Sequence, residues 1–429
     1  MTPSVQLTRP GPLRNLFPKE DRGYLLASLL IQLVLGLLFG HVYDIRIFMA
    51  TGYLVATGQD PYIPQNLTAI FHNSAFQGMT TIGYPPPWPL ILGLIYLVSF
   101  TPFHNLLIYN LAIKLPIIIA NFALAYLVRT ILKDQGANPA VARKVWIFLL
   151  FNPFLLYFTT AWGQFDSLVA LITLAAVVTL YKYHLVISSI LLALAISLKP
   201  TPVPVVLVVM VFLWGRPWKK LLVYLLVLAV CLLLFCVAPF FLLGWDATPI
   251  RQGWNAQFTV SGGMSLTTIY ELINNTYLLP GNWWLLGIIW LPAIILAAVF
   301  LPRGNNGLTG LIRNSLILIL IFFLTRTWLS EQNVTLILPL VLILVALGEM
   351  PALLLTATWV LPLIFTVFNT SPPQLLFPIL PDLMAKALQW MDLYRFPRLV
   401  ARMVIVIPWQ VAGWWMVKRG FRQTTPKPV

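Results

Sequence analysis

The first long apolar stretch of the chain is GYLLASLLIQLVLGLLFGHVY, residues 23–43, and it ends directly before Asp44. A membrane-spanning helix needs roughly 20 consecutive apolar residues, so we predict that this stretch crosses a lipid bilayer. Residues 1–22 are polar and basic, which argues against a signal peptide. Only 12 of the 429 residues are acidic. A carboxylate at the end of a membrane helix in such a chain is a functional candidate.

The composition excludes a soluble globular protein. Hydrophobic residues make up 59% of the chain, charged residues make up 9%, and the mean hydropathy is +0.87. We therefore predict an all-α polytopic membrane protein. The net charge of +15 does not indicate nucleic-acid binding, because no basic stripe alternates with aromatic residues. Lys and Arg gather at the ends of apolar stretches, where they orient the helices and contact anionic membrane lipids.

One apolar stretch, 85–100, begins within GYPPPWP (residues 83–89). Its prolines and its interfacial tryptophan predict a helix that lies on the outer membrane surface. The remaining stretches predict about 12 transmembrane helices. They fall near residues 23–43, 106–131, 144–160, 165–182, 184–198, 201–215, 219–243, 283–301, 309–325, 333–348, 351–369 and 397–417.

The positions of Lys and Arg predict the orientation, because cytoplasmic loops are enriched in these residues. They cluster before residue 23, within 129–144 and after residue 417, so we expect both termini in the cytoplasm. The segment 370–397 is assigned to the outside, although it contains Lys386 and Arg395. The predicted organisation is a cytoplasmic segment at 1–22, a transmembrane module at 23–243 with an external loop at 44–105, an external loop at 244–282, a second transmembrane module at 283–418 and a cytoplasmic tail at 419–429.

Asp44 opens a stretch whose apolar spacing over 45–57 predicts an interfacial helix ending at Gly58. In a structural interpretation, Asp44 caps that helix or pairs with Arg46. In a functional interpretation, it is a catalytic carboxylate. Asp60, just before Pro61, fits a turn.

Two further outer turns contain acidic residues. The first, WGQFDS at 162–167, includes Trp162, Gln164 and Asp166, and Asp166 could instead cap the following helix. The second, SEQN at 330–333, includes Glu331 and Gln332, and Glu331 could instead mark a helix start.

Three cations are candidates for holding an anion on the outer side. Lys199 lies in LKPTP (198–202), where prolines break two short apolar stretches. A phosphate could lie against such a cation, although Lys199 could also extend to the lipid headgroups. Arg326 and Arg251 are the other cations of this kind. The sequence has no P-loop, GxGxxG, HExxH or GxSxG motif, so an activated substrate must arrive without a nucleotide-binding domain.

Together these motifs resemble the GT-C superfamily of integral-membrane glycosyltransferases. The resemblance rests on the aspartate closing the first span, GQDPY (58–62), the outer YPPP helix, GQFD (163–166) and LKPTP (198–202). Within the superfamily the chain is most similar to mannosyltransferases, including the bacterial polyprenyl-phosphomannose-dependent group. The similarity covers roughly residues 23–220, and beyond these it rests on SEQN (330–333).

The resemblance implies transfer of a hexose, mannose being the expected one, from a polyprenyl-phosphate-linked donor to a lipid or glycan acceptor. It implies Asp44 as catalytic base and Asp166 as the acid of the second loop. An inverting transfer needs such a base and groups that hold the leaving phosphate, for which Lys199, Arg326 and Arg251 are candidates. The expected substrate-binding residues are Gln164, Tyr62, Trp162, Glu331 and Gln332.

Because the leaving group is already a phosphate ester, no metal or other cofactor is required. Trp254, Tyr84 and Trp88 could stack on sugars or anchor surface helices. We expect a multi-pass protein of the plasma membrane whose active site faces outward. The rival hypotheses are a secondary transporter, suggested by the helix break at Lys199, and a lipid-linked glycan flippase or polymerase.

Overall fold

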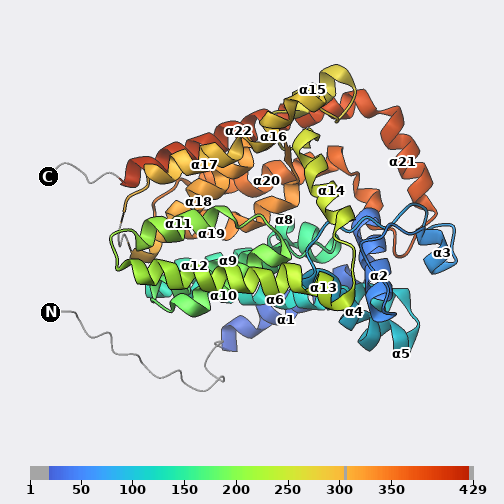
Figure 1. Ribbon diagram of the computed structural model, residues 1–429, viewed down its shortest axis with the longest axis horizontal. Coiled ribbons are helices and arrows are strands. Elements are labelled where there is room, and N and C mark those ends of the chain that lie inside the picture. Colours follow the sequence, from blue (N-terminus) through green and yellow to red (C-terminus); the bar gives the residue numbers. More distant parts are fainter. Residues whose placement is uncertain (1–18, 304–306, 425–429) are drawn as a thin grey trace.

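The computed structural model describes residues 19–303 and 307–424, and the regular structure in these residues is almost entirely helical (Figure 1). Among these described residues, eight helices are long and apolar enough to cross a membrane. These findings confirm the predicted all-α polytopic fold. Most of the predicted N-terminal segment 1–22, and part of the tail 419–429, lie outside the described residues.

The long apolar helices correspond to the longer predicted stretches, and several run on through a π-helical turn. They are α1 (Arg22–Leu38), α6 (Leu106–Asp134), α7 (Pro139–Phe151) with α8 (Pro153–Leu155) and η4 (Leu156–Ala161), α12 (Trp218–Leu232) with η5 (Leu233–Val237) and α13 (Ala238–Leu243), α16 (Trp284–Ile288) with α17 (Trp290–Val299), α18 (Gly307–Thr325), α20 (Ala352–Asn369) and α22 (Arg395–Thr424).

Shorter apolar helices occupy the remaining stretches. They are α4 (Pro87–Ile95) with η3 (Tyr96–Phe100) and α5 (Thr101–Phe103), α9 (Asp166–Tyr181), α10 (Leu185–Leu198), α11 (Pro204–Leu213), and η8 (Glu331–Leu336) with α19 (Leu338–Ala346). The other elements connect them. They are η2 (Lys19–Asp21), α2 (Val42–Ala56), α3 (Leu67–Phe71), α14 (Thr248–Ala256), η6 (Gln257–Thr259), α15 (Thr268–Asn274), η7 (Gly281–Trp283), η9 (Pro372–Leu375), α21 (Leu383–Leu393) and the parallel strands β1 (Gly262–Gly263) and β2 (Trp328–Leu329).

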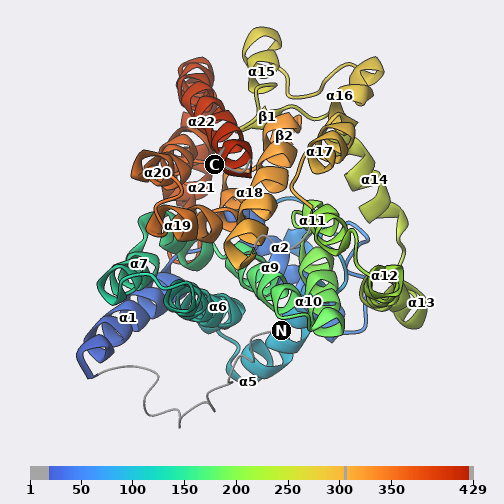
Figure 2. The same ribbon diagram turned by 90° about the vertical axis from the view of Figure 1, so that its left-hand side faces the viewer.

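Helix α18 lies in the middle of the bundle, between α11, α17, α19 and α22 (Figure 2). Its sequence from Leu316 to Leu324 is apolar on all sides, which is expected of a helix with neighbours all round. Almost every residue from Leu308 to Leu324 is buried. The helix ends at Thr325, so the following turn, which contains Arg326, starts from a rigid support.

The segments between the spans gather at one end of the bundle. Figure 1 shows α2, α3, α5 and α21 at the end opposite to that at which α22 terminates. The backbone N–H of Gly40 donates to the carbonyl of Leu375 at 2.8 Å, and the rings of Phe76 and Phe377 are 5.1 Å apart. The backbone N–H of Asp246 donates to the Asp60 carboxylate at 2.6 Å. The segments 44–105, 244–282 and 370–397 therefore meet on the same side.

The junction between α1 and α2 is fixed by polar side chains of α6. Asn110 Nδ2 donates to the carbonyls of Gly36, Leu37 and Phe39 at 2.9 to 3.0 Å. The buried Lys114 ammonium donates to the carbonyls of Gly36, Phe39 and Ala161. The carbonyls of Gly36 and Leu37 belong to the last turn of α1 and have no partner within that helix. The two α6 side chains therefore allow the chain to leave α1 and begin α2 only a few residues later.

Helix α2 starts at Val42, three residues before the predicted start at residue 45, and ends at Ala56. The predicted stop is confirmed, because Gly58 has a φ of 73°, a conformation that suits glycine after a helix. Within α2, Gly52 lets α4 approach closely, since a Cβ there would lie 2.7 Å from the Leu92 carbonyl oxygen. The early start places Asp44 in the first turn of the helix.

The predicted sidedness can be tested by cysteine labelling. In a background with Cys231→Ala and Cys236→Ala, we expect Gln77→Cys to react with a membrane-impermeant maleimide on intact cells. Ala140→Cys should react only after the membrane is opened. Both positions are exposed, and they lie in the predicted outer loop and in the basic 129–144 loop. Labelling of both variants from outside would contradict the topology, and the cysteine-free background controls for non-specific reaction.

Candidate active site

A cavity of about 460 Å³ opens among the connecting segments that gather at one end of the bundle. It is lined by residues of α2, the 81–84 stretch, the 199–203 turn, the 254–258 region and the 326–333 turn. Its charged lining residues are Asp44, Lys199 and Arg326. One carboxylate and two cations, far apart in sequence, therefore face one space.

The Asp44 carboxylate is held by one side chain from a distant turn and by one from the residues just before α2. Trp162 Nε1 donates to Asp44 Oδ2 at 2.5 Å, and His41 Nδ1 lies 3.3 Å from the same oxygen. The N-cap of α2 is His41, so Asp44 does not cap the helix. Arg46 donates instead to the backbone carbonyl of Gln77. The two structural alternatives for Asp44, a cap and a pair with Arg46, are therefore wrong.

The carboxyl group of Asp44 is ionised at neutral pH. Burial raises its pKa, but the contacts with His41 and Trp162 outweigh burial and hold the pKa below the usual value of about 3.9. About a quarter of the side chain remains accessible, at 24%. A general base must be deprotonated and reachable, and Asp44 meets both requirements.

The turn that holds Trp162 has an unusual backbone. The π-helical turn η4 ends directly before Trp162, and such turns are frequent at functional sites. Gly163 follows with a φ of 101°, and a Cβ there would lie 3.1 Å from Lys114 Cε. Glycine is therefore needed to turn the chain between Trp162 and Gln164. Gln164 is fully buried, and Tyr84 Oη donates to its Oε1 at 3.4 Å.

Lys199 is one half of a buried ion pair, which the sequence patterns did not predict. Its ammonium group donates to Asp166 Oδ1 at 2.7 Å, and only 9% of the Lys199 side chain is exposed. The alternative in which Lys199 extends to the lipid headgroups is therefore wrong. Asp166 is 2% exposed and does not line the cavity. It makes no side-chain cap to α9, whose N-cap is Phe165. Asp166 acts on the cavity through Lys199.

Arg326 enters the cavity from the turn after α18. Its Nη2 donates to Gln257 Oε1 at 3.1 Å, and its guanidinium lies over the Phe322 ring at 5.1 Å. Burial lowers the pKa of Arg326 to about 10, so the group is positively charged at neutral pH. Its amide-bearing partner Gln257 is neutral, which leaves the positive charge available to an anion.

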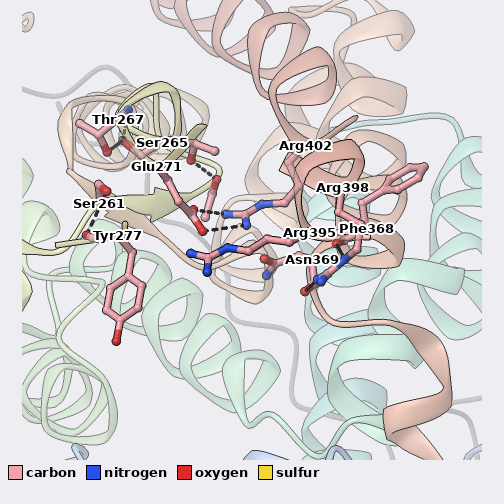
Figure 3. A network of polar contacts seen from close by, with 12 residues as sticks. Ser261, Ser265, Thr267, Glu271, Tyr277, Phe368, Asn369, Arg395, Arg398 and Arg402 are labelled. Carbon is pink, nitrogen blue, oxygen red and sulfur yellow. Dashed lines mark hydrogen bonds and ion pairs between the residues drawn. The ribbon is translucent and has the colours of Figure 1, made fainter. Parts of the chain in front are cut away.

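The backbone near Arg326 is anchored to the C-terminal part of the chain. Ser265 Oγ donates to the Arg326 carbonyl, and strand β1 pairs with β2. The segment that carries Ser265 is held in turn by Glu271, which pairs with Arg402 of α22 at 2.8 Å (Figure 3). Arg398 of the same helix donates to the carbonyls that end α20 (Figure 3). Arg402 is thus a structural support for the segment that carries Ser265, and Arg398 fixes the end of α20.

Of the other predicted site residues, Gln332 lines the cavity, whereas Glu331, Tyr62 and Arg251 do not. Glu331 is buried and accepts from Asn369 Nδ2 at 3.1 Å. Tyr62 is buried, and its hydroxyl donates to the Tyr84 carbonyl at 2.9 Å. Arg251 is exposed on α14 and does not line the cavity.

Aromatic side chains form much of the cavity wall, namely Tyr84, Trp254, Trp290 and Trp328. Trp254 Nε1 donates to the Gly83 carbonyl at 3.1 Å, and Trp328 Nε1 donates to Ser330 Oγ at 3.1 Å. The sequence motifs indicate Tyr84 and Trp254, but they give no signal for Trp290 and Trp328 or for His41 beside Asp44. The chain contains 16 Trp residues, and because Trp also gathers at membrane interfaces, spacing alone does not identify those that line a cavity. Trp88, by contrast, is fully buried against Phe165.

The sequence and the fold are similar to those of known proteins. The sequence profile of glycosyltransferase family 87 matches residues 84–327, a range that includes Asp166 and Lys199 and begins after Asp44. No curated protein sequence matches the chain. The fold is similar to the crystal structure of ArnT from Cupriavidus metallidurans bound to undecaprenyl phosphate. The TM-score is 0.50 and the identity 15%, over 94% of this chain and 77% of ArnT. The profile match covers more than half of the chain, which therefore belongs to glycosyltransferase family 87.

Proposed function

We propose that the protein transfers a hexose from a polyprenyl-phosphate-linked donor to a hydroxyl group of a lipid or glycan acceptor. The observation that supports this proposal is one cavity that contains an accessible carboxylate, two cations and aromatic walls. An undecaprenyl phosphate is the lipid named for the similar ArnT structure. Mannose is the expected sugar, on the basis of the motifs shared with polyprenyl-phosphomannose-dependent enzymes.

The reaction assigns each charged group one task. Asp44 removes the proton from the acceptor hydroxyl, whose oxygen forms a bond to C1 of the sugar. The bond between C1 and the phosphate oxygen breaks, and its electron pair leaves with the phosphate. Lys199 and Arg326 neutralise the negative charge that develops there. Attack from the face opposite to the phosphate inverts the configuration at C1.

The remaining lining residues suit the uncharged parts of the substrates. Tyr84, Trp254 and Trp328 offer ring faces to the sugar. Val203, Phe258 and Phe322 form an apolar side of the same cavity, where the first units of a polyprenyl chain would lie. The Lys and Arg distribution favours the external face of the plasma membrane for this site.

The proposal is tested with purified protein in proteoliposomes, radiolabelled polyprenyl-phosphomannose and candidate acceptor lipids. Appearance of label in the acceptor, with release of polyprenyl phosphate, supports the transferase. Uptake of label into vesicles without transfer supports a transporter instead. Neither transfer nor release with any polyprenyl-phosphate sugar would contradict the proposed donor class.

The Arg326→Ala variant should raise the KM for the donor by about 10- to 100-fold. The reason is that a hydrogen bond to a charged group contributes about 1.5–3 kcal/mol. Arg251→Ala is the matched comparison, because Arg251 is an exposed arginine outside the cavity lining, and it should change the KM far less. Initial rates at varied donor concentration measure both. A larger loss in Arg251→Ala would place the phosphate at α14 and contradict the assignment to Arg326.

A further inference from the structure

His41 lies in the short connection between α1 and α2, beside the proposed base. Its side chain is buried, at 3% exposed. Its backbone N–H donates to the Trp162 carbonyl at 3.1 Å, and its ring stacks on the Trp162 ring with centroids 3.7 Å apart and planes 19° apart. Both the backbone and the ring of His41 are therefore fixed against Trp162.

The His41 ring faces the carboxylate of Asp44. Its Nδ1 lies 3.3 Å from Asp44 Oδ2, the same oxygen that accepts from Trp162 Nε1. Within the described residues, neither ring nitrogen of His41 makes a hydrogen bond of full geometry. Hydrogen bonds in ligand-free active sites are often long and tighten when substrate binds. Asp44 is thus the partner in reach of Nδ1.

A purely structural role does not account for this placement. The His41 side chain makes no cap to α2, and packing against Trp162 alone would leave two buried polar nitrogens unpaired, which is costly. Moreover, Lys114 binds the carbonyls of Phe39 and Ala161, close to His41 and Trp162 in the chain. The backbone on both sides of the Asp44 carboxylate is therefore held by one ammonium group.

We propose that His41 is a positioning residue that donates its Nδ1–H to Asp44 Oδ2 and, with Trp162, orients the carboxylate toward the acceptor hydroxyl. Both donors occupy Oδ2, so Oδ1 is the oxygen that receives the proton. This inference rests on the proposed function, in which Asp44 is the base. His41 itself does not touch the substrate, and its effect passes through Asp44.

The test compares His41→Asn with His41→Gln. The Asn amide nitrogen lies the same number of bonds from Cα as Nδ1 and can replace that donor, whereas the longer Gln places its amide elsewhere. Asn is also a good N-cap residue, so α2 should still form. We expect His41→Asn to keep most of the transfer rate. We expect His41→Gln to lose about 10- to 100-fold in kcat, by comparison with the range known for residues that orient metal ligands through hydrogen bonds, with the KM for the donor unchanged.

A double variant separates positioning from a general effect on folding. In the Asp44→Asn background, His41→Gln should cause no further loss, because there is no carboxylate left to orient. Tyr43→Phe serves as the control, since Tyr43 is about half exposed and lies next to His41 without contacting the cavity. Thermal unfolding in detergent checks that each variant is folded.

The outcomes distinguish this inference from the proposed function. If the wild-type protein and Tyr43→Phe transfer sugar but His41→Gln is equally active, His41 has no positioning role and the transferase proposal stands. Equal losses in His41→Asn and His41→Gln, or a further loss in the Asp44→Asn background, would also overturn the inference. If the wild-type protein transfers no sugar from any polyprenyl-phosphate donor, the proposed function fails and this inference fails with it.

Discussion

The Asp44→Asn variant should transfer sugar about 10²- to 10⁴-fold more slowly than the wild-type protein, because loss of a general base typically costs this factor. The amide keeps the size of the carboxylate and can still accept from Trp162 Nε1, which lies 2.5 Å from Oδ2. It cannot take a proton from the acceptor. We therefore expect kcat to fall while the KM for the donor changes little, as measured by initial rates in proteoliposomes.

Asp60→Asn is the matched control for that experiment. Asp60 lies in the same segment between α1 and α6, but its carboxylate accepts from the backbone N–H groups of Tyr62 and Asp246 and does not line the cavity. Asparagine retains one of these acceptors, so transfer should stay near the wild-type rate. If Asp44→Asn also remained near the wild-type rate, at matched expression and thermal stability, Asp44 would be a structural residue.

The helices could be predicted from the sequence because a long apolar stretch in a lipid bilayer satisfies its backbone hydrogen bonds by forming a helix. Stretches such as 106–131 and 309–325 are long, predominantly apolar and bounded by charged or turn-forming residues, and they form α6 and α18. The start of α2 was less predictable. It depends on Asn110 and Lys114 of α6, which bind the carbonyls at the end of α1.

Site residues could be predicted where their residue type is scarce in the chain. They could not be predicted where their role depends on a partner from another segment. Asp44 was identifiable because acidic residues are scarce. The ion pair of Asp166 with Lys199, separated by 33 positions, was not predicted, because each residue had a plausible local role as a cap or at the lipid headgroups. His41 was missed because a single histidine next to a helix start carries no pattern. Its proposed role depends on stacking with Trp162, which lies in a different turn of the chain.

The Lys199→Met variant should lose about 10²- to 10³-fold in kcat, the cost typical of removing one group that stabilises a developing oxyanion. This variant alone is ambiguous. It leaves the Asp166 carboxylate buried without its cation, and breaking a buried ion pair from one side typically costs about 3–5 kcal/mol of stability. Lost activity could then reflect unfolding.

The double variant Lys199→Met with Asp166→Asn resolves the ambiguity, because it removes both charges while keeping both shapes. An unpaired amide costs less to bury than an unpaired carboxylate, so thermal unfolding in detergent should occur at a higher temperature than in Lys199→Met alone. Transfer should stay low, since no ammonium remains beside the leaving phosphate and Arg326 alone faces it. If the double variant recovered both stability and transfer, Lys199 and Asp166 would be a structural pair, and the donor phosphate would depend on Arg326 without them.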